Sequence, residues 1–309
     1  MNTIVSATDV FWRVVTVFSL TVFGVIARKS GTLKEEARQS LADTIMNITL
    51  PSLIFVSMTS DISWDRLVSG AISPFLALGL VLLMMVVAMF VGRFIPMTDE
   101  RRRTFMVLCS MPNTSFIAFP VILSLLGQEG LAYAVLYDIG TTVAFCSVAI
   151  LVLHGGVVEK GTWKALLNPA LIATVIGLTV KRMGFEVPEL VLAPFRIMGN
   201  ATVPLAMLFT GYLLAGLGFQ RSAISLELGI VCLLKLFVYP ALACFLILPF
   251  DVDPLVRTVV IIQAAMPSMA SAPVLVQKYG GDGEFAVASV FTTTLLSVLT
   301  IPLMIGLLG

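Results

Sequence analysis

Polar residues suited to binding an anion lie between paired prolines at two places in this otherwise apolar chain. The stretches are MPNTSFIAFP at residues 111–120 and MPSMASAP at residues 266–273. A proline inside a helix removes a hydrogen bond and collides with the preceding turn, so two close prolines should break the helix. Broken helix ends expose backbone N–H groups and the positive end of the helix dipole, which attract anions. We therefore expect helix breaks at Pro112, Pro120, Pro267 and Pro273, with substrate-binding residues Asn113, Thr114, Ser115, Ser268, Met269 and Ser271. The alternative is a pair of ordinary proline kinks whose hydroxyl groups bond back to their own helices.

The composition places these stretches in a membrane. Hydrophobic residues make up 58% of the 309 residues and charged residues 12%, and the mean hydropathy is +1.03. Soluble domains carry about twice that share of charge. The net charge of +1 gives no field that would draw the chain to nucleic acid. The cysteines lie inside apolar segments and are interpreted as packing residues, with no metal site: Cys109, Cys146, Cys232 and Cys244.

Ionisable side chains at membrane depth form a second group of candidates, because a charge in lipid is costly and usually serves a function. We interpret Lys235 as a ligand for a substrate carboxylate, and Asp138 with Gln263 as the ion-coupling group. The alternative is a structural ion pair, or a lysine whose amine reaches the membrane interface. Asp43 and Arg196 occupy equivalent places in the two halves of the chain and are expected to face each other.

The second half of the chain repeats the first. Asn47 and Pro51 return 153 residues later as Asn200 and Pro204, which we interpret as structural bends. A membrane span needs about 20 mostly apolar residues. Ten segments qualify: 8–28, 40–59, 68–95, 104–126, 130–153, 164–183, 189–217, 222–248, 255–278 and 284–308. Five spans per half is an odd number, so residues 1–154 and 155–309 form two five-helix repeats that face opposite ways in the bilayer. This all-α arrangement is typical of inverted-repeat secondary transporters.

Lysines and arginines predict the orientation. Twelve lie on one side of the predicted spans: Arg28, Lys29, Lys34, Arg38, Arg93, Arg101, Arg102, Arg103, Lys160, Lys164, Arg221 and Lys278. Six lie on the other side: Arg13, Arg66, Lys181, Arg182, Arg196 and Arg257. The positive-inside rule then predicts a multi-pass protein of the cell (inner or plasma) membrane with both termini outside the cytoplasm.

Other classes of function find little support in the residues. An intramembrane enzyme needs a nucleophile and a base, and His154 is the only histidine, at the end of a predicted span. The chain has no phosphate-binding loop of the Gly-X-X-X-X-Gly-Lys-Ser/Thr type, which argues against an ATP-driven pump. An uncoupled facilitator or channel, or a membrane sensor, remains open as an alternative.

The chain resembles the auxin efflux carrier family over its whole length. The resemblance lies in Pro112-Asn113 followed by Phe119-Pro120, in the Asn-X-Thr-X-Pro of residues 47–51, and in PVLVQKYGGD at residues 273–282 before a last span rich in serine and threonine. Ser268 departs from the pattern, since many relatives carry asparagine there. The family includes bacterial permeases related to the plant PIN-formed carriers.

The resemblance implies two inverted five-helix repeats, like those of the bile acid:sodium symporters. Helices 1, 2, 6 and 7 would form a scaffold, helices 3–5 and 8–10 a transport domain, and the broken helices 4 and 9 would cross at the substrate site. It also implies a homodimer. The expected function is secondary transport of small organic anions, malonate-like acids or auxin-like acids, driven by protons or sodium and without a cofactor.

Overall fold

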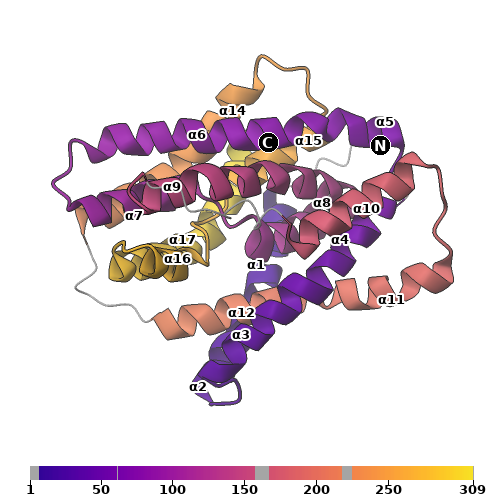
Figure 1. Ribbon diagram of the computed structural model, residues 1–309, viewed down its shortest axis with the longest axis horizontal. Helices are drawn as coiled ribbons and strands as arrows, with labels where there is room; N and C mark the ends of the chain where they lie inside the picture. Colours follow the sequence, from indigo (N-terminus) through magenta and orange to yellow (C-terminus); the bar gives the residue numbers. More distant parts are fainter. Residues whose placement is uncertain (1–6, 61, 157–166, 218–224, 309) are drawn as a thin grey trace.

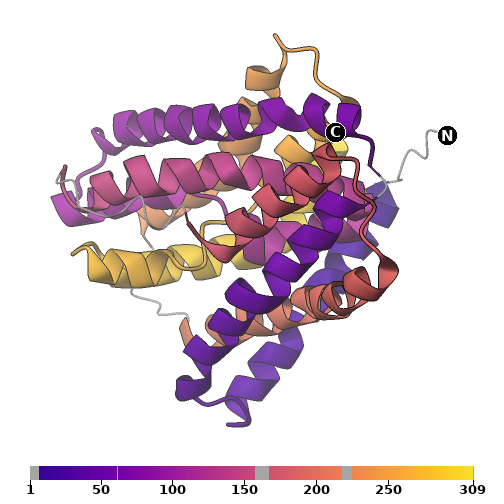
Figure 2. The same cartoon turned by 45° about the vertical axis from the view of Figure 1, so that its right-hand side comes forward.

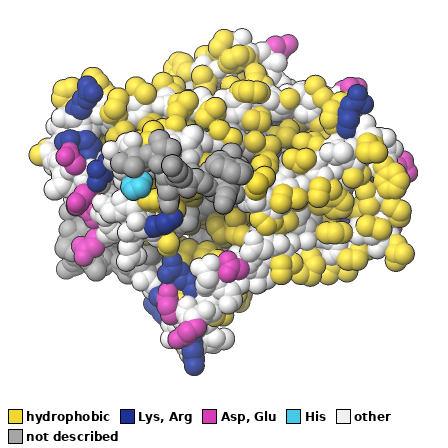
Figure 3. Space-filling model, in the orientation of Figure 1, with side chains coloured by type: hydrophobic (Ala, Val, Ile, Leu, Met, Phe, Trp, Pro, Cys, Tyr) yellow, Lys and Arg dark blue, Asp and Glu magenta, His cyan; other side chains and the backbone are white. Residues whose placement is uncertain are grey.

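The computed structural model describes residues 7–60, 62–156, 167–217 and 225–308, and within these ranges it contains helices and no strand. Seven helical segments are long and apolar enough to cross a membrane: Thr8–Lys29, Glu35–Thr59, Trp64–Gly92, Thr114–Leu153, Glu189–Gly216, Leu226–Ile247 and Gly283–Leu307. Hydrophobic side chains cover most of the face in Figure 3, while charged ones gather toward its edges. The protein is therefore a helical, multi-pass membrane protein.

The difference between ten predicted spans and seven long segments has three local causes. The predicted ranges 104–126 and 255–278 are each divided by a break. The segment Thr114–Leu153 contains Gly127 at φ 68°, which divides it into two helices. The helix within 164–183 is only 14 residues long, Pro169–Arg182, in the part of that range that is described. Ten spans in two inverted repeats stay a prediction.

One group of helices lies together on one side of the molecule (Figures 1 and 2). Within it α2 packs against α12, and α4 packs against α10 and α11. Its elements are α2 (Thr21–Lys29), α3 (Glu35–Thr44), the π-helical turn η1 (Ile45–Thr49), α4 (Leu50–Thr59), α10 (Pro169–Arg182), α11 (Glu189–Asn200) and α12 (Thr202–Leu217). We call it the first unit.

The second unit is a stack in which α6 packs against α7 and α8, and α17 packs against α7, α13 and α16. Its elements are α5 (Trp64–Ser69), η2 (Gly70–Ile72), α6 (Ser73–Gly92), α7 (Asp99–Ser110), η3 (Thr114–Ala118), α8 (Phe119–Ala144), η4 (Phe145–Ala149), α9 (Ile150–Leu153), α13 (Leu226–Leu233), η7 (Leu234–Val238), α14 (Tyr239–Ile247), α15 (Pro254–Ala264), α16 (Ala272–Lys278) and α17 (Gly283–Leu308). The helix α1 (Ala7–Ser19) leads into α2 and packs on α8 and α17, so it joins the two units.

Glycines let α2 and α12 approach closely. A Cβ atom added at Gly24 on α2 would collide with the backbone carbonyl of Leu208 on α12. In return, a Cβ atom at Gly211 on α12 would collide with the backbone carbonyl of Thr21 on α2. Small residues facing each other in this way are how membrane helices gain packing contacts without a hydrophobic driving force.

Ion pairs link the connections between helices in two separate sets. Arg101, at the start of α7, pairs with Asp282 at 3.0 Å and with Glu227 at 3.7 Å. Asp282 lies just before α17, and Glu227 lies in the first turn of α13. In the other set Arg66 on α5 pairs with Glu129 at 2.8 Å. Asp253, just before α15, lies 4.0 Å from Arg66. Connections that the sequence predicts to share a side of the membrane therefore lie together. The basic residues Lys160, Lys164 and Arg221 fall outside the described residues.

Candidate functional site

The two helix breaks meet and hydrogen-bond to each other. The backbone N–H of Asn113 donates to the carbonyl of Pro267 at 2.9 Å, and the N–H of Met269 donates to the carbonyl of Met111 at 3.1 Å. Pro112 and Ser268 stand opposite each other as a short antiparallel pair. Irregular backbone at membrane depth must find partners within the protein. Here each break supplies partners for the other, so the helix formed by α7 and η3–α8 crosses the one formed by α15 and α16.

The prolines differ in what they do to their helices. Pro112 and Pro267 lie in the breaks, and Pro273 lies in the first turn of α16, where a missing N–H costs little. Pro120 does not break its helix, because the chain stays helical from Thr114 to Leu126. The π-helical turn η3 ends two residues before Pro120 and widens the helix where the proline cannot donate a hydrogen bond. The expected break at Pro120 is therefore corrected to residues 111–113.

A cavity of about 280 Å³ adjoins the crossing. Its wall includes five residues of the two breaks that the sequence predicted to bind substrate, and the predicted coupling residue Asp138. The lining residues are Met46, Leu50, Met111, Pro112, Asn113, Thr114, Ser115, Phe116, Asp138, Thr141, Thr142, Phe145, Cys146, Asn168, Ala170, Met269, Ala270 and Ser271. The side chains come from both units, so the cavity lies between them.

Asn113 presents an unused donor at this cavity. Its Oδ1 accepts a hydrogen bond from the N–H of Phe116 at 3.3 Å and so caps the helix that begins at Thr114. Its Nδ2 is buried and has no partner among the described residues. An unsatisfied buried donor costs roughly 1–3 kcal/mol, and a ligand with an acceptor oxygen would recover that free energy.

Asp138 stands in the cavity wall and is held by two hydroxyl groups. The Oγ1 atom of Thr114 donates to Oδ1 of Asp138, and the Oγ1 atom of Thr141 donates to the same oxygen at 3.2 Å. The first bond links the broken helix to the following one. Sequence reasoning missed Thr141, although it follows Asp138 by three residues and so lies on the same helix face.

Asn168 was also missed, although the sequence carried a signal. Its Oδ1 accepts from the N–H of Leu171 at 2.8 Å and caps α10. Asparagine followed by proline is a frequent helix start. The helix start therefore puts a polar side chain from the first unit at the cavity.

Three predicted site residues lie away from the cavity. Ser268 is fully buried, donates to the carbonyl of Leu108 at 2.8 Å, and its N–H donates to Thr293 at 3.3 Å. It therefore fastens the crossing to α7 and α17. Gln263 donates to the carbonyl of Ala134 at 3.3 Å. Lys235 is fully buried in η7, with Nζ 3.8 Å from the ring centre of Tyr239.

Asp43 and Arg196 do not face each other as expected. Asp43 accepts a hydrogen bond from Gln39 at 2.9 Å, and Arg196 pairs with Glu189 at 2.7 Å. Each finds its partner on its own helix, at a spacing of four and seven residues. Equivalent positions in two repeats did not predict contact.

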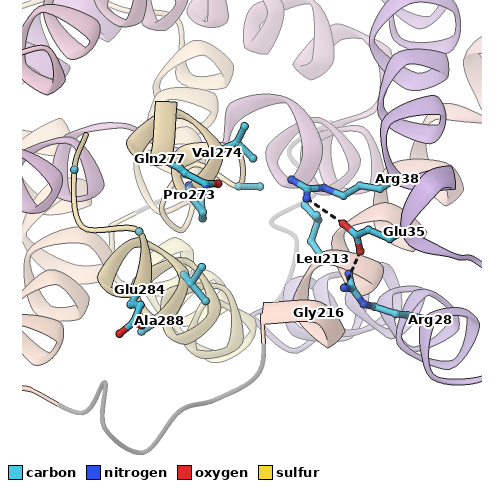
Figure 4. A pocket seen from close by; sticks show the side chains of 14 residues that line it. Arg28, Glu35, Arg38, Leu213, Gly216, Pro273, Val274, Gln277, Glu284 and Ala288 are labelled. Carbon is cyan, nitrogen blue, oxygen red and sulfur yellow. Dashed lines mark hydrogen bonds and ion pairs between the residues drawn. The ribbon is translucent and has the colours of Figure 1, made fainter. Parts of the chain in front are cut away.

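A larger cavity of about 640 Å³ separates α2, α3 and α12 from α16 and α17 (Figure 4). On one wall Glu35 holds Arg28 at 2.9 Å and Arg38 at 3.2 Å, and Arg28 also lies over the Tyr212 ring. Gln277, Pro273 and Glu284 stand on the opposite wall. Ala270 lines both cavities, so the larger one lies next to the cavity at the crossing.

The helical membrane fold and a polar crossing next to a cavity define the class as a membrane transporter. Comparison with known protein families agrees. The family described as membrane transport protein matches residues 9–156 and again residues 155–305. The chain belongs to this family, the auxin efflux carrier family that the motifs indicate.

Individual relatives are similarly named. An uncharacterized transporter of Methanocaldococcus jannaschii is 28% identical over 94% of this chain and 96% of its own length. An uncharacterized transporter of Methanothermobacter thermautotrophicus is 28% identical over 94% and 95%. A protein provisionally named a malonate transporter, from Rhizobium meliloti, is 29% identical over half of each chain.

Proposed function

We propose that the protein is a secondary transporter of small organic anions, mono- or dicarboxylates of the malonate or auxin-like kind. The observation that carries the proposal is the buried, unpartnered Nδ2 of Asn113, a residue that lines the cavity at the crossing. Ser115 and Ser271 line the same cavity and add hydroxyl donors, while the hydroxyl of Thr114 donates to Asp138. These neutral donors bind a carboxylate without fixing a permanent charge in the membrane. The relative named for malonate supports this class of substrate.

Asp138 supplies the reason for coupling to a cation. A carboxylate in the wall of an anion site repels the substrate unless a proton or a sodium ion neutralises it. Each ligand then favours binding of the other, and this mutual coupling free energy links the two fluxes. A cation gradient can in this way drive accumulation of the anion.

Alternating access would arise from movement of the second unit, as transport domain, against the first unit, as scaffold. The large cavity separates the two units beside Arg28 and Arg38. On the other side, Ser57 donates to the carbonyl of Gln128 at 2.9 Å, and Arg13 on α1 donates to the carbonyl of Ser124 at 2.7 Å. These bonds support a state that is closed on that side and open on the side that the positive-inside rule assigns to the cytoplasm.

A homodimer in the cell membrane fits the surface of the first unit. Asn47 and Asn200 are exposed there, beside exposed Ile48 and Ile197. Amide groups on an apolar surface at membrane depth gain by hydrogen bonding to another protein chain. Asn47→Leu with Asn200→Leu should therefore weaken the dimer, and light scattering in detergent measures the mass. An unchanged dimer would place the interface elsewhere.

Uptake into proteoliposomes tests the transport function. A panel of labelled mono- and dicarboxylates is offered under an imposed proton gradient, an imposed sodium gradient, or neither. Saturable uptake that depends on one gradient supports a coupled carrier and names its ion. Saturable flux without gradient dependence identifies an uncoupled facilitator. Binding without flux across the panel would replace transport with sensing.

A further inference from the structure

Two tight turns of the second unit have the same backbone conformation, 153 residues apart. Each ends the helix that follows one of the two breaks. Gly127 begins the first turn at φ 68°, and Gly280 begins the second at φ 74°, both in the left-handed region that glycine tolerates. We call residues 127–129 the first turn and residues 280–282 the second turn. Their separation is that of the repeat in the sequence.

An acidic residue fastens each turn to the second unit. Glu129 of the first turn pairs with Arg66 on α5 at 2.8 Å. Asp282 of the second turn pairs with Arg101 on α7 at 3.0 Å. The two turns therefore move with the second unit, and the difference between them lies in their contact with the first unit.

The first turn is docked on the first unit. The buried hydroxyl of Ser57 on α4 donates to the carbonyl of Gln128 in this turn at 2.9 Å. Arg13 on α1 donates to the carbonyl of Ser124, one helical turn earlier, at 2.7 Å. These bonds close this side of the molecule.

The second turn lies on the large cavity between the two units. Gln128 and Ser124 correspond, 153 residues later, to Gly281 and Gln277. Both of these residues line the cavity of about 640 Å³, and Leu213 on α12 lines it from the first unit (Figure 4). The positions that are docked on one side of the molecule thus face a cavity on the other side.

Thr210 on α12 is the counterpart of Ser57, again 153 residues later. It is buried one helical turn before Leu213, so it lies on the helix face that borders the cavity. Its hydroxyl donates to the carbonyl of Ala206, four residues earlier on the same helix, at 2.8 Å. A hydroxyl that bonds within its own helix can exchange this partner for another carbonyl at little cost.

We propose that Thr210 holds the large cavity shut in the opposite-facing state, by donating to the carbonyl of Gly281. When two repeats face opposite ways, each takes in one state the conformation that the other has in the opposite state. The bond from Ser57 to Gln128 then breaks, and Ser57 bonds back to the carbonyl of Leu53, four residues earlier on its own helix. One bond between the units replaces another, so the two states stay close in free energy. The inference rests on the proposed transport function and the predicted repeat, and it names a contact of the second state.

The experiment measures the width of the large cavity in proteoliposomes. Spin labels on cysteines at Leu213 and Gln277, in a background without the four native cysteines, report the distance between its walls by pulsed electron paramagnetic resonance. The two states should give a long and a short distance. Thr210→Val should lower the ratio of short to long about fivefold, because only the closed cavity loses a bond between the units. Ser57→Ala should raise the same ratio about fivefold.

Two substitutions are matched controls that should leave the ratio unchanged. Thr210→Ser keeps a hydroxyl at the same place. Ser52→Ala removes a buried hydroxyl on α4 that bonds back to the carbonyl of Ile48 at 2.7 Å, within its own helix. Thr210→Ala carries the test if the valine variant does not fold.

The outcomes separate this inference from the function on which it rests. A ratio that Thr210→Val leaves unchanged, or moves in the same direction as Ser57→Ala, would overturn the role of Thr210. If wild-type uptake is saturable, that result removes this inference alone. Absence of saturable wild-type uptake would instead contradict the proposed transport function.

Discussion

Asn113 combines a structural and a chemical role within one side chain. Its oxygen caps the helix after the break, and its buried nitrogen has no partner among the described residues, in a side chain that lines the cavity. The two roles can be separated, because aspartate keeps the oxygen that accepts from Phe116 but replaces the amide donor with a second oxygen. The aspartate substitution should therefore affect transport and helix capping differently.

Asn113→Asp should keep the helix cap, lose about 1–3 kcal/mol of stability to the buried carboxyl group, and lower anion transport by about a hundredfold, since a buried donor to a carboxylate is worth about 2–3 kcal/mol. Asn113→Ala should lose transport too, with about 1 kcal/mol of stability from the missing cap. The measurements are initial uptake rates and thermal unfolding in detergent. Normal uptake by the aspartate variant would mean that Nδ2 does not touch the substrate.

The sequence predicted which part of the fold a site residue lies in better than it predicted where the side chain points. Asn113, Thr114, Ser115, Met269 and Ser271 line the cavity, whereas Ser268, between two break residues, points away. Successive side chains of an extended backbone point in opposite directions. The sequence predicted only that the helix would break here, so it did not indicate which side chains of the break point toward the cavity. Likewise, the place of Lys235 within its predicted span indicated its depth in the membrane, but not which face of the helix carries the side chain.

Among the helical elements, π-helical turns recur before prolines. The turns η1, η3 and η7 end two residues before Pro51, Pro120 and Pro240 respectively. A wider turn accommodates a missing backbone donor without breaking the helix. Sequence reasoning interpreted Pro120 as a break, because a proline by itself does not show whether a wide turn precedes it.

Replacing Pro120 with alanine should let η3 tighten toward α-helical geometry. The tightening would rotate Thr114 relative to Asp138 and weaken the bond between them, so uptake should fall while thermal stability stays level or rises. Pro254→Ala is the control, because Pro254 lies in the first turn of α15, where no donor is missed. Uptake at the wild-type level in Pro120→Ala would show that the wide turn does not set the site.

The α2–α12 contact predicts a stability effect. Gly24→Ala puts a methyl group against the carbonyl of Leu208 and should cost about 1–3 kcal/mol, measured as thermal unfolding in detergent. Gly229→Ala on α13 meets no atom within 4 Å and should be neutral or stabilising. Equal stability of the two variants would contradict the close approach of α2 and α12.

Across the whole molecule, the larger cavity lies on one side of the crossing, because Ala270 lines both cavities. A cysteine at Gln277, in a background without the four native cysteines, should react with a membrane-impermeant thiol reagent from the side of Arg28 and Arg38. Saturating substrate should change its reaction rate as the units move. Reaction from the opposite side alone would reverse the assigned opening.

The most direct test of the central claim is uptake of labelled malonate and related carboxylates into proteoliposomes under imposed proton or sodium gradients, with Asn113→Asp alongside. We predict saturable, gradient-dependent uptake by the wild-type protein and loss of uptake in the folded variant. Saturable wild-type uptake that the variant retains in full would contradict a substrate site at the crossing. The absence of uptake for every acid, with the protein folded, would contradict transport of small organic anions.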